Sequence, residues 1–226
     1  MANWCITNYH FVGAKEEIDN LHKKLTDWTS EKTIENSFGK TWLGQVADGL
    51  GVDWNSIPCR GHITYMDDQL YDTDKPGIAQ FDLETETAWV PCFGLFAKLM
   101  EKEAPHCRML FVANEPGCGV CETNDASWEY FDEEYYVEYS LGEEGKKYAE
   151  FFGDESSDWW SKSSVEYAVR KALSDNSTPL ATLVEKLNDE AREWAKDYLT
   201  IQKIEVISAE DYSALVARDL SELMYK

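Results

Sequence analysis

The sequence predicts an α+β protein whose core is a ferredoxin-like fold, a split βαββαβ unit with an antiparallel sheet and helices on one face. Strand and helix patterns follow in that order through the first half of the chain, and residues 79–87 alternate strictly between buried-type and polar side chains. Helical patterns dominate after residue 141. We therefore expect a ferredoxin-like core with extra strands over 1–140 and a mostly helical C-terminal extension over 141–226, packed together as a single compact domain.

The first elements are an interior strand and an amphipathic helix. Residues 4–12 carry apolar or aromatic side chains on both faces, which is typical of a strand inside a sheet. Gly13 ends this strand. The helix that follows has one apolar stripe, formed by Ile18, Leu21, Leu25 and Trp28.

The middle of the chain predicts a hairpin followed by a helix and further strands. We expect, in order, a polar loop over 29–40, a short helix ending at Gly51, strands over 61–66 and 79–87 around an acidic turn, a helix after Pro91, and strands over 108–113, 118–123 and 134–139. In the last of these strands, Tyr135, Val137 and Tyr139 should face inward.

The C-terminal part predicts three helices and one strand. Ser163 and Glu166 form a capping box that opens one helix, and Thr178-Pro179 opens the next. A strand over 201–207 and a helix from Ser208 complete the chain. The role of residues 142–200 does not follow from their pattern.

The charge balance restricts the possible partners. The chain has 226 residues, with 43 Asp and Glu against 21 Lys and Arg, and a formal net charge of −22. Nucleic acids and anionic membranes attract proteins through Lys and Arg, so we expect neither as a direct partner. The acidity alone favours solubility, and it also favours a basic protein as partner.

The cysteine content and the N-terminal sequence indicate a cytoplasmic protein. Residues 1–10 contain no basic segment followed by an apolar run, as a signal peptide would. The most apolar stretch, residues 92–100, is short and includes Lys98, so no membrane span is expected. Six cysteines are too few for a disulfide scaffold of this length, and we expect free thiols in a reducing compartment.

Three short motifs resemble those of a known family. Asn3-Trp4-Cys5 followed by Gly13, Thr87-Ala88-Trp89-Val90-Pro91, and Glu115-Pro116-Gly117 are similar to the YubB-type ferredoxin-like proteins of phages, plasmids and bacterial genomes. The resemblance covers roughly residues 1–140 and departs from some members at Thr7 and Asn8, where these place Asn two residues after the Cys. It implies the ferredoxin-like fold and a mobile-element context, and it supplies no catalytic residues because the family has no established activity.

The motif residues have two interpretations. In the first, Trp4 and Trp89 are core aromatics and the motifs are structural. In the second, Trp4, Cys5, Trp89 and Glu115 surround a binding pocket. No catalytic residue is expected from the four scattered histidines or from the paired acids at 132–134, which are too common in this chain to single out.

Cys118-Gly-Val-Cys121 is the motif that points most directly to a specific chemistry. Two thiolates at this spacing can share zinc or form a redox pair, but structural zinc needs two further ligands and the chain has no second Cys-x-x-Cys. Two ordinary strand cysteines are the alternative. Gly39-Lys40-Thr41 lacks the glycines of a phosphate-binding loop, and the acidic turn at 72–83 lacks the Glu that closes a calcium loop. We expect no cofactor.

Residues 128–139 combine aromatic rings with acids, which disfavours nucleic acid because the acids repel phosphates. Such a stretch is either an amphipathic strand with a buried aromatic face or a protein-binding face. We therefore expect a non-enzymatic acidic protein-binding module, with a basic nucleic-acid-handling protein as its candidate partner. The alternative is a thiol or zinc protein that uses Cys118 and Cys121.

Overall fold

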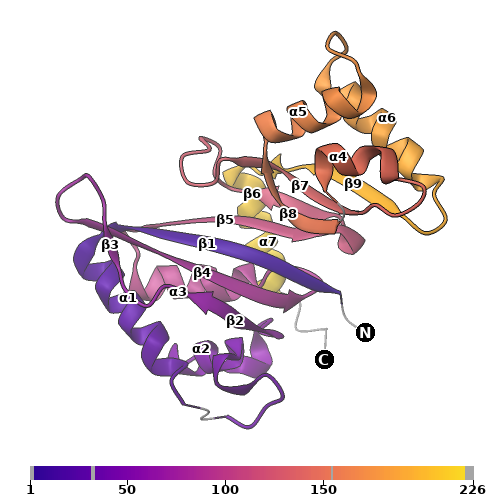
Figure 1. Cartoon of the computed structure of the whole chain (residues 1–226). Coiled ribbons are helices and arrows are strands. Elements are labelled where there is room, and N and C mark those ends of the chain that lie inside the picture. The colour runs from indigo at the N-terminus through magenta and orange to yellow at the C-terminus, as the bar shows by residue number, and fades with distance from the viewer. Residues whose placement is uncertain (1–2, 32–33, 154, 222–226) are drawn as a thin grey trace. The chain divides into compact units, whose positions relative to one another are not determined.

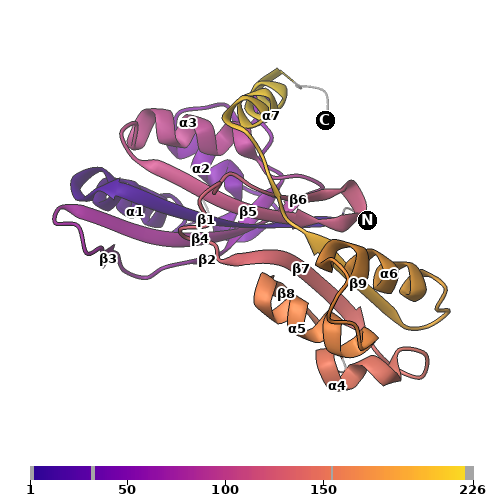
Figure 2. The same cartoon turned by 90° about the horizontal axis from the view of Figure 1, so that it is seen from above.

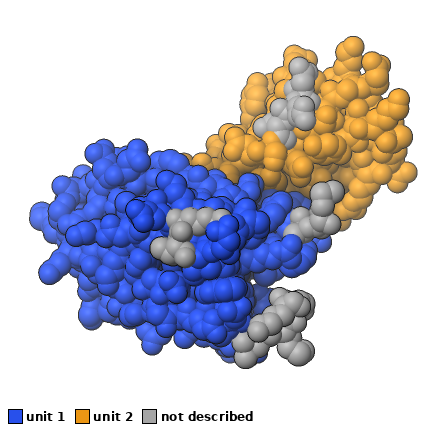
Figure 3. Space-filling view, turned by 90° about the horizontal axis from the view of Figure 1, so that it is seen from below, with its two compact units in different colours: residues 1–126, 206–226 blue, residues 127–205 orange. Residues whose placement is uncertain are grey.

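A computed structural model of the chain describes residues 3–31, 34–153 and 155–221. Its contacts divide the chain into two compact units, unit 1 (Met1–Ala126 and Val206–Lys226) and unit 2 (Ser127–Glu205), which Figure 3 colours separately. Unit 2 is thus an insertion in the sequence of unit 1. The division differs from the boundary at residue 140 expected from the sequence, because residues 133–140 pair with strands of unit 2 and the C-terminal helix packs in unit 1.

Unit 1 contains one large sheet whose strands differ in length. Its strands are β1 (Trp4–Ala14), β2 (Gly61–Met66), β3 (Tyr71–Asp72), β4 (Ile78–Ala88), β5 (Arg108–Glu115) and β6 (Val120–Thr123), joined at the edge by β10 (Glu205–Val206). The strand order is β10-β6-β5-β1-β4-β2, with β3 paired to β4. Strands β5, β1, β4 and β2 run antiparallel to their neighbours, so β1 is an interior strand, as its two apolar faces predict.

Helices cover one face of this sheet (Figures 1 and 2). They are α1 (Lys15–Trp28), α2 (Leu43–Gly49), α3 (Phe93–Glu103) and α7 (Ala209–Ser221). The core between sheet and helices is aromatic: Phe11 stacks on Phe81 at 4.8 Å between ring centroids, and Tyr9 stacks on Phe96 at 4.1 Å. Helix α7 is tied to α3 because the buried Asp219 carboxylate accepts a hydrogen bond from the Gly94 backbone N–H at 3.0 Å.

Unit 2 repeats the arrangement on a smaller scale. Its antiparallel sheet has the order β8-β7-β9, formed by β7 (Glu133–Ser140), β8 (Glu155–Ser161) and β9 (Tyr198–Lys203). Its helices are α4 (Ala149–Phe152), α5 (Lys162–Leu173) and α6 (Leu180–Arg192), and Figure 1 shows them beside the sheet. Tyr135, Val137 and Tyr139 are buried in its core, which confirms the inward face predicted for β7.

Two sequence expectations need correction in unit 2. Helix α5 is capped by Ser161, whose hydroxyl accepts a hydrogen bond from the Ser164 N–H at 3.2 Å, and not by a capping box of Ser163 and Glu166. The segment 142–200 is less helical than predicted, because Glu155–Ser161 forms strand β8 along β7. Trp160 on this strand packs against the core and Trp159 contacts Tyr136 at 5.0 Å, an alternation typical of a strand. The architecture as a whole is mixed α+β, as the sequence predicts. No helix among the described residues is both long enough and apolar enough to cross a bilayer.

Candidate protein-binding face

The face of the unit 1 sheet opposite helices α1 and α3 carries a row of acids on β4. Along this strand the buried residues Phe81, Leu83 and Thr85 alternate with Asp82, Glu84 and Glu86, which retain solvent exposure. Because successive strand side chains point to opposite faces, the three acids share one face. We call this surface the acidic face; its members are Asp82, Glu84 and Glu86 with the side chains that flank them.

The hairpin that contains this row is strongly acidic. The segment 61–88 contains one lysine, Lys75, and no arginine. Its acids are Asp67, Asp68, Asp72, Asp74, Asp82, Glu84 and Glu86. The electrostatic field of this hairpin therefore attracts cations, and its strength at a distance depends on ionic strength.

Exposed aromatic rings lie at the Glu86 end of the row. Trp4 stands opposite Ala88 in the β1–β4 register and leaves 42 % of its surface exposed. Its ring meets Phe38 edge-on at 6.0 Å between centroids, and Phe38 in turn stacks on His62 at 5.9 Å. His62 lies opposite Glu86 across β2 and β4. An exposed tryptophan that is held in place by neighbouring rings is typical of a binding surface.

Trp89 is also exposed, and its backbone is unusual. It follows the end of β4 with φ at 68°, a left-handed conformation that costs a bulky residue about 1–3 kcal/mol and is most often kept at functional sites. Its N–H donates to the Asn3 carbonyl oxygen at 2.9 Å, and the Arg60 guanidinium lies 4.8 Å from its ring centroid.

The expectation that Trp4 and Trp89 are core aromatics is therefore wrong. Their exposed fractions are 42 % and 40 %. The strand register explains Trp4, since it places this side chain with Ile6 and Glu86 on the face away from the helices. Trp89 lies beyond the last residue of β4, where strand alternation no longer applies.

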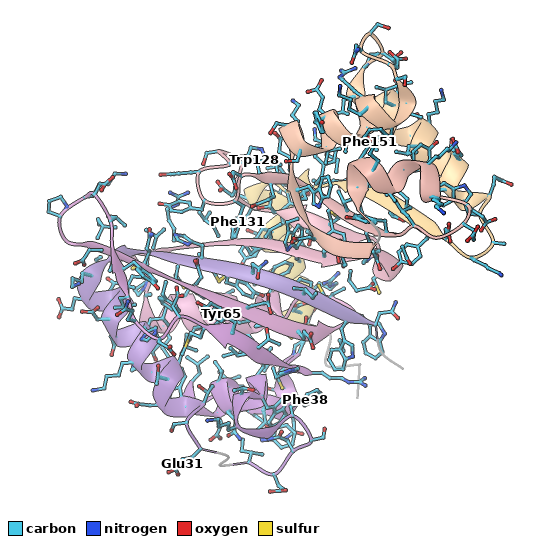
Figure 4. The ribbon with its side chains drawn as sticks, viewed as in Figure 1. Glu31, Phe38, Tyr65, Trp128, Phe131 and Phe151 are labelled. Carbon is cyan, nitrogen blue, oxygen red and sulfur yellow. The ribbon has the colours of Figure 1, made fainter. Side chains whose placement is uncertain are left out.

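Two exposed tyrosines lie toward the Asp82 end of the row. Tyr65, which is opposite Glu84 and is labelled in Figure 4, has 55 % of its surface exposed, and Tyr71 has 47 %. The Tyr65 hydroxyl donates to Asp67 Oδ1 at 2.6 Å, and this hydrogen bond raises the pKa of Tyr65 to about 12. Asp67 Oδ2 also accepts from the Asp82 N–H at 2.7 Å, so the buried Asp67 fixes this end of the surface.

Glu115 and Cys5 have structural roles. Glu115 is buried, and its carboxylate accepts hydrogen bonds from the N–H groups of Gly117 (3.1 Å) and Cys118, which holds the turn before β6. A side chain at Gly117 would collide with the Asn3 amide. Cys5 lies wholly in the core, where burial raises its pKa to about 12. Asn3 thus contacts both the Trp89 segment and the Gly117 segment. The second and third motifs therefore both contact the first motif, Asn3-Trp4-Cys5.

The two cysteines of the Cys-x-x-Cys motif lie in different environments. Cys118 is exposed and Cys121 is buried. The Glu115 carboxylate, through its hydrogen bond to the thiol, raises the pKa of Cys118, which leaves less thiolate for nucleophilic or redox chemistry. Across the described ranges, no three His, Cys, Asp or Glu residues come close enough together to hold a metal ion. The thiol or zinc alternative stays a prediction that these observations do not test.

Sequence reasoning missed four members of this surface. Phe38, Arg60, His62 and Tyr65 come from loops or an edge strand, and none belongs to a motif. The alternation of β2 carried a partial signal, but a bulge between Ile63 and Tyr65 shifts the register and moves Tyr65 onto the acidic face. Phe38 (Figure 4) had no signal, because only the fold brings its loop beside β2.

Comparison with known proteins identifies no relative. Family models, curated proteins and solved structures all give no match to this chain. The function must therefore be inferred from the geometry and charge of the surface itself.

Proposed function

We propose that this protein is a non-enzymatic binding module that engages a basic protein through the acidic face of unit 1. The observation that carries the proposal is the row Asp82, Glu84 and Glu86 with exposed aromatic rings at both ends. Aromatic residues supply most of the binding energy at protein interfaces, whereas charge complementarity gives specificity and fast association. A surface that combines both suits a protein partner.

The charge of the molecule supports the same class of partner. A net charge of −22 repels nucleic-acid phosphates and anionic lipid headgroups, and it steers a basic protein toward the surface. Proteins that handle nucleic acids carry such basic surfaces, and we propose one of them as the partner. The acidic face would then cover the surface that the partner uses for phosphate.

We further propose that unit 1 has the ferredoxin-like topology. Among its strands the order β5-β1-β4-β2, with antiparallel neighbours and helices on one face, supports this assignment. Membership of the YubB-type family and a mobile-element origin are proposals that rest on the three motifs. We also propose a reducing, cytoplasmic location, which is supported by cysteines that form no disulfide among the described residues.

The proposal is tested by neutralising part of the row. The variant Glu84→Gln/Glu86→Gln removes two charges from the acidic face, and Glu185→Gln/Glu193→Gln removes two exposed charges from unit 2 as a matched control. Affinity for a synthetic arginine- and lysine-rich peptide, measured by calorimetry at 50 and 300 mM salt, should fall with salt for the wild type. We expect the first variant to bind roughly 5–30-fold more weakly and the control to stay within about twofold.

Equal losses in both variants would show that net charge alone drives binding, and would contradict a specific face. Absence of peptide binding by the wild type at low salt would also contradict the proposal. Capture from a bacterial lysate at the two salt concentrations then identifies the natural partner.

A further inference from the structure

The Trp4 ring is partly exposed and is held in place by neighbouring rings. It is exposed to 42 %, yet the contact with Phe38 at 6.0 Å and the stacking of Phe38 on His62 fix its orientation. A ring that is already ordered loses little conformational entropy when a partner group packs on it. Electron-rich indole faces attract cations more strongly than other aromatic side chains do.

Glu86 lies within reach of this ring. It stands opposite Ile6 on β1 and opposite His62 on β2, and Trp4 is two residues before Ile6 on the same face. Such diagonal neighbours in an antiparallel pair lie close enough for long side chains to touch the same group. Within the part of the chain that the structure describes, the Glu86 carboxylate has no hydrogen bond or ion pair to occupy it.

From this juxtaposition we infer that the Trp4–Glu86 site binds the guanidinium group of an arginine side chain of the partner. The guanidinium stacks on the Trp4 ring and donates two parallel hydrogen bonds to the Glu86 carboxylate. The inference rests on the proposed function and deepens it, because it names the chemical group that the acidic face recognises. Arginine fits better than lysine, since a planar, weakly hydrated guanidinium can stack and pair with a carboxylate at the same time.

The adjacent Arg60 already makes this type of contact within the molecule. Its guanidinium lies over the Trp89 ring at 4.8 Å, which shows that the local geometry accepts such a group on an indole. Arg60 is exposed, and its backbone carbonyl accepts a hydrogen bond from the Ala88 N–H, so its positive charge stands next to the Trp4 end of the acidic face. The Arg60 charge therefore repels an incoming cation, and its guanidinium covers the Trp89 ring. Removal of Arg60 should strengthen binding of an arginine ligand.

The test compares two peptides of equal charge. One alternates arginine with glycine over eight residues, the other replaces each arginine with lysine, and a third carries neutral citrulline. Binding is measured by calorimetry, and by two-dimensional NMR of the tryptophan indole N–H signals, with the Trp4 signal assigned from the Trp4→Phe variant. We expect the arginine peptide to bind roughly fivefold more tightly than the lysine peptide and to shift the Trp4 signal, with no binding of citrulline.

Variants separate the contributions of the three residues. Trp4→Ala should weaken arginine binding roughly 5–20-fold and Glu86→Gln roughly fivefold, whereas Arg60→Ala should tighten it roughly twofold. Tyr167→Ala, which removes another exposed aromatic ring from unit 2, should leave it unchanged. The thermal midpoint of each variant confirms that it is folded, and the gain expected for Arg60→Ala cannot result from misfolding.

The outcomes distinguish this inference from the proposed function. Equal binding of the arginine and lysine peptides, or an unchanged affinity in Trp4→Ala, overturns the guanidinium site even if neutralising Glu84 and Glu86 together still weakens binding. In that case the acidic face remains a general site for basic partners. If neither cationic peptide binds the wild type, both the inference and the proposed function are wrong.

Discussion

The two sheets of this protein use aromatic side chains in opposite ways. In unit 2, Tyr135 and Tyr139 lie on the face of β7 that packs in the core, and both are buried. In unit 1, Trp4 begins β1 on the face away from the helices, Trp89 follows the end of β4, and both are exposed. Both units contain a sheet with helices and an aromatic core, so composition does not distinguish these positions.

The comparison teaches that the face of the sheet on which an aromatic ring lies decides whether it is buried or exposed. Tyr135 and Tyr139 face the helices of unit 2 and pack in the core, and the Tyr139 hydroxyl donates to the Phe152 carbonyl oxygen. Trp4 lies on the face of the unit 1 sheet that points away from the helices, and its ring is accessible to a partner. Exposure of large rings costs solvation free energy, and therefore an exposed cluster indicates an interaction surface.

The largest effect should follow from a change in the unit 1 core. Phe111→Ala removes a fully buried ring that packs on Phe93 at 4.6 Å and on Tyr212 at 5.8 Å, and we expect a loss of ~3–5 kcal/mol in the free energy of unfolding. Trp4→Ala, in the same unit, should cost less than about 1 kcal/mol. Urea unfolding measures both values. A loss for Trp4→Ala as large as that for Phe111→Ala would show that Trp4 belongs to the core.

A smaller effect should distinguish the two buried tyrosines. Tyr139→Phe leaves the Phe152 carbonyl without its donor and should cost about 1–2 kcal/mol. The Tyr9 hydroxyl is buried and has no hydrogen-bond partner among the described residues, so Tyr9→Phe should be neutral or slightly stabilising. Thermal unfolding of the two variants gives the comparison. Destabilisation by Tyr9→Phe would imply that an ordered water satisfies this hydroxyl.

The smallest effect concerns the acid stability of unit 2. Asp175 accepts hydrogen bonds from the N–H groups of Thr178 and Ser177, which hold its pKa below the ordinary value of 3.8. A lowered pKa in the folded state stabilises the protein above the unfolded-state pKa, near 4, and this stabilisation is lost as the pH falls through the folded-state pKa.

Asp175→Asn should therefore flatten the dependence of unfolding free energy on pH below about 4, with little change in its slope at neutral pH. Glu185→Gln is the matched control, because it removes one exposed carboxylate from helix α6 of the same unit. Urea unfolding between pH 2 and 7 measures the slopes. Identical slopes for wild type and Asp175→Asn would contradict the lowered pKa.

The sequence by itself determined the local elements and the character of the surface. Alternation located β4 and its acidic side, the apolar stripes located α1, α3 and α6, and the composition established the negative charge. These features depend on periods of two or 3.6 residues along the chain, which side-chain burial imposes directly on the sequence. The acids at 82, 84 and 86 were therefore recognisable before the fold was known.

The tertiary structure decided which residues share a surface. It inserted unit 2 between β6 and β10, exposed Trp4 and Trp89, and brought Phe38 and His62 from separate segments to one strand end. No local period records these relations, because strand order, a register-shifting bulge and chain-end packing depend on contacts between residues far apart in sequence. The three acids of the row belong to one strand and follow from its alternation, whereas the aromatic residues beside them come from separate segments that only the tertiary fold brings together.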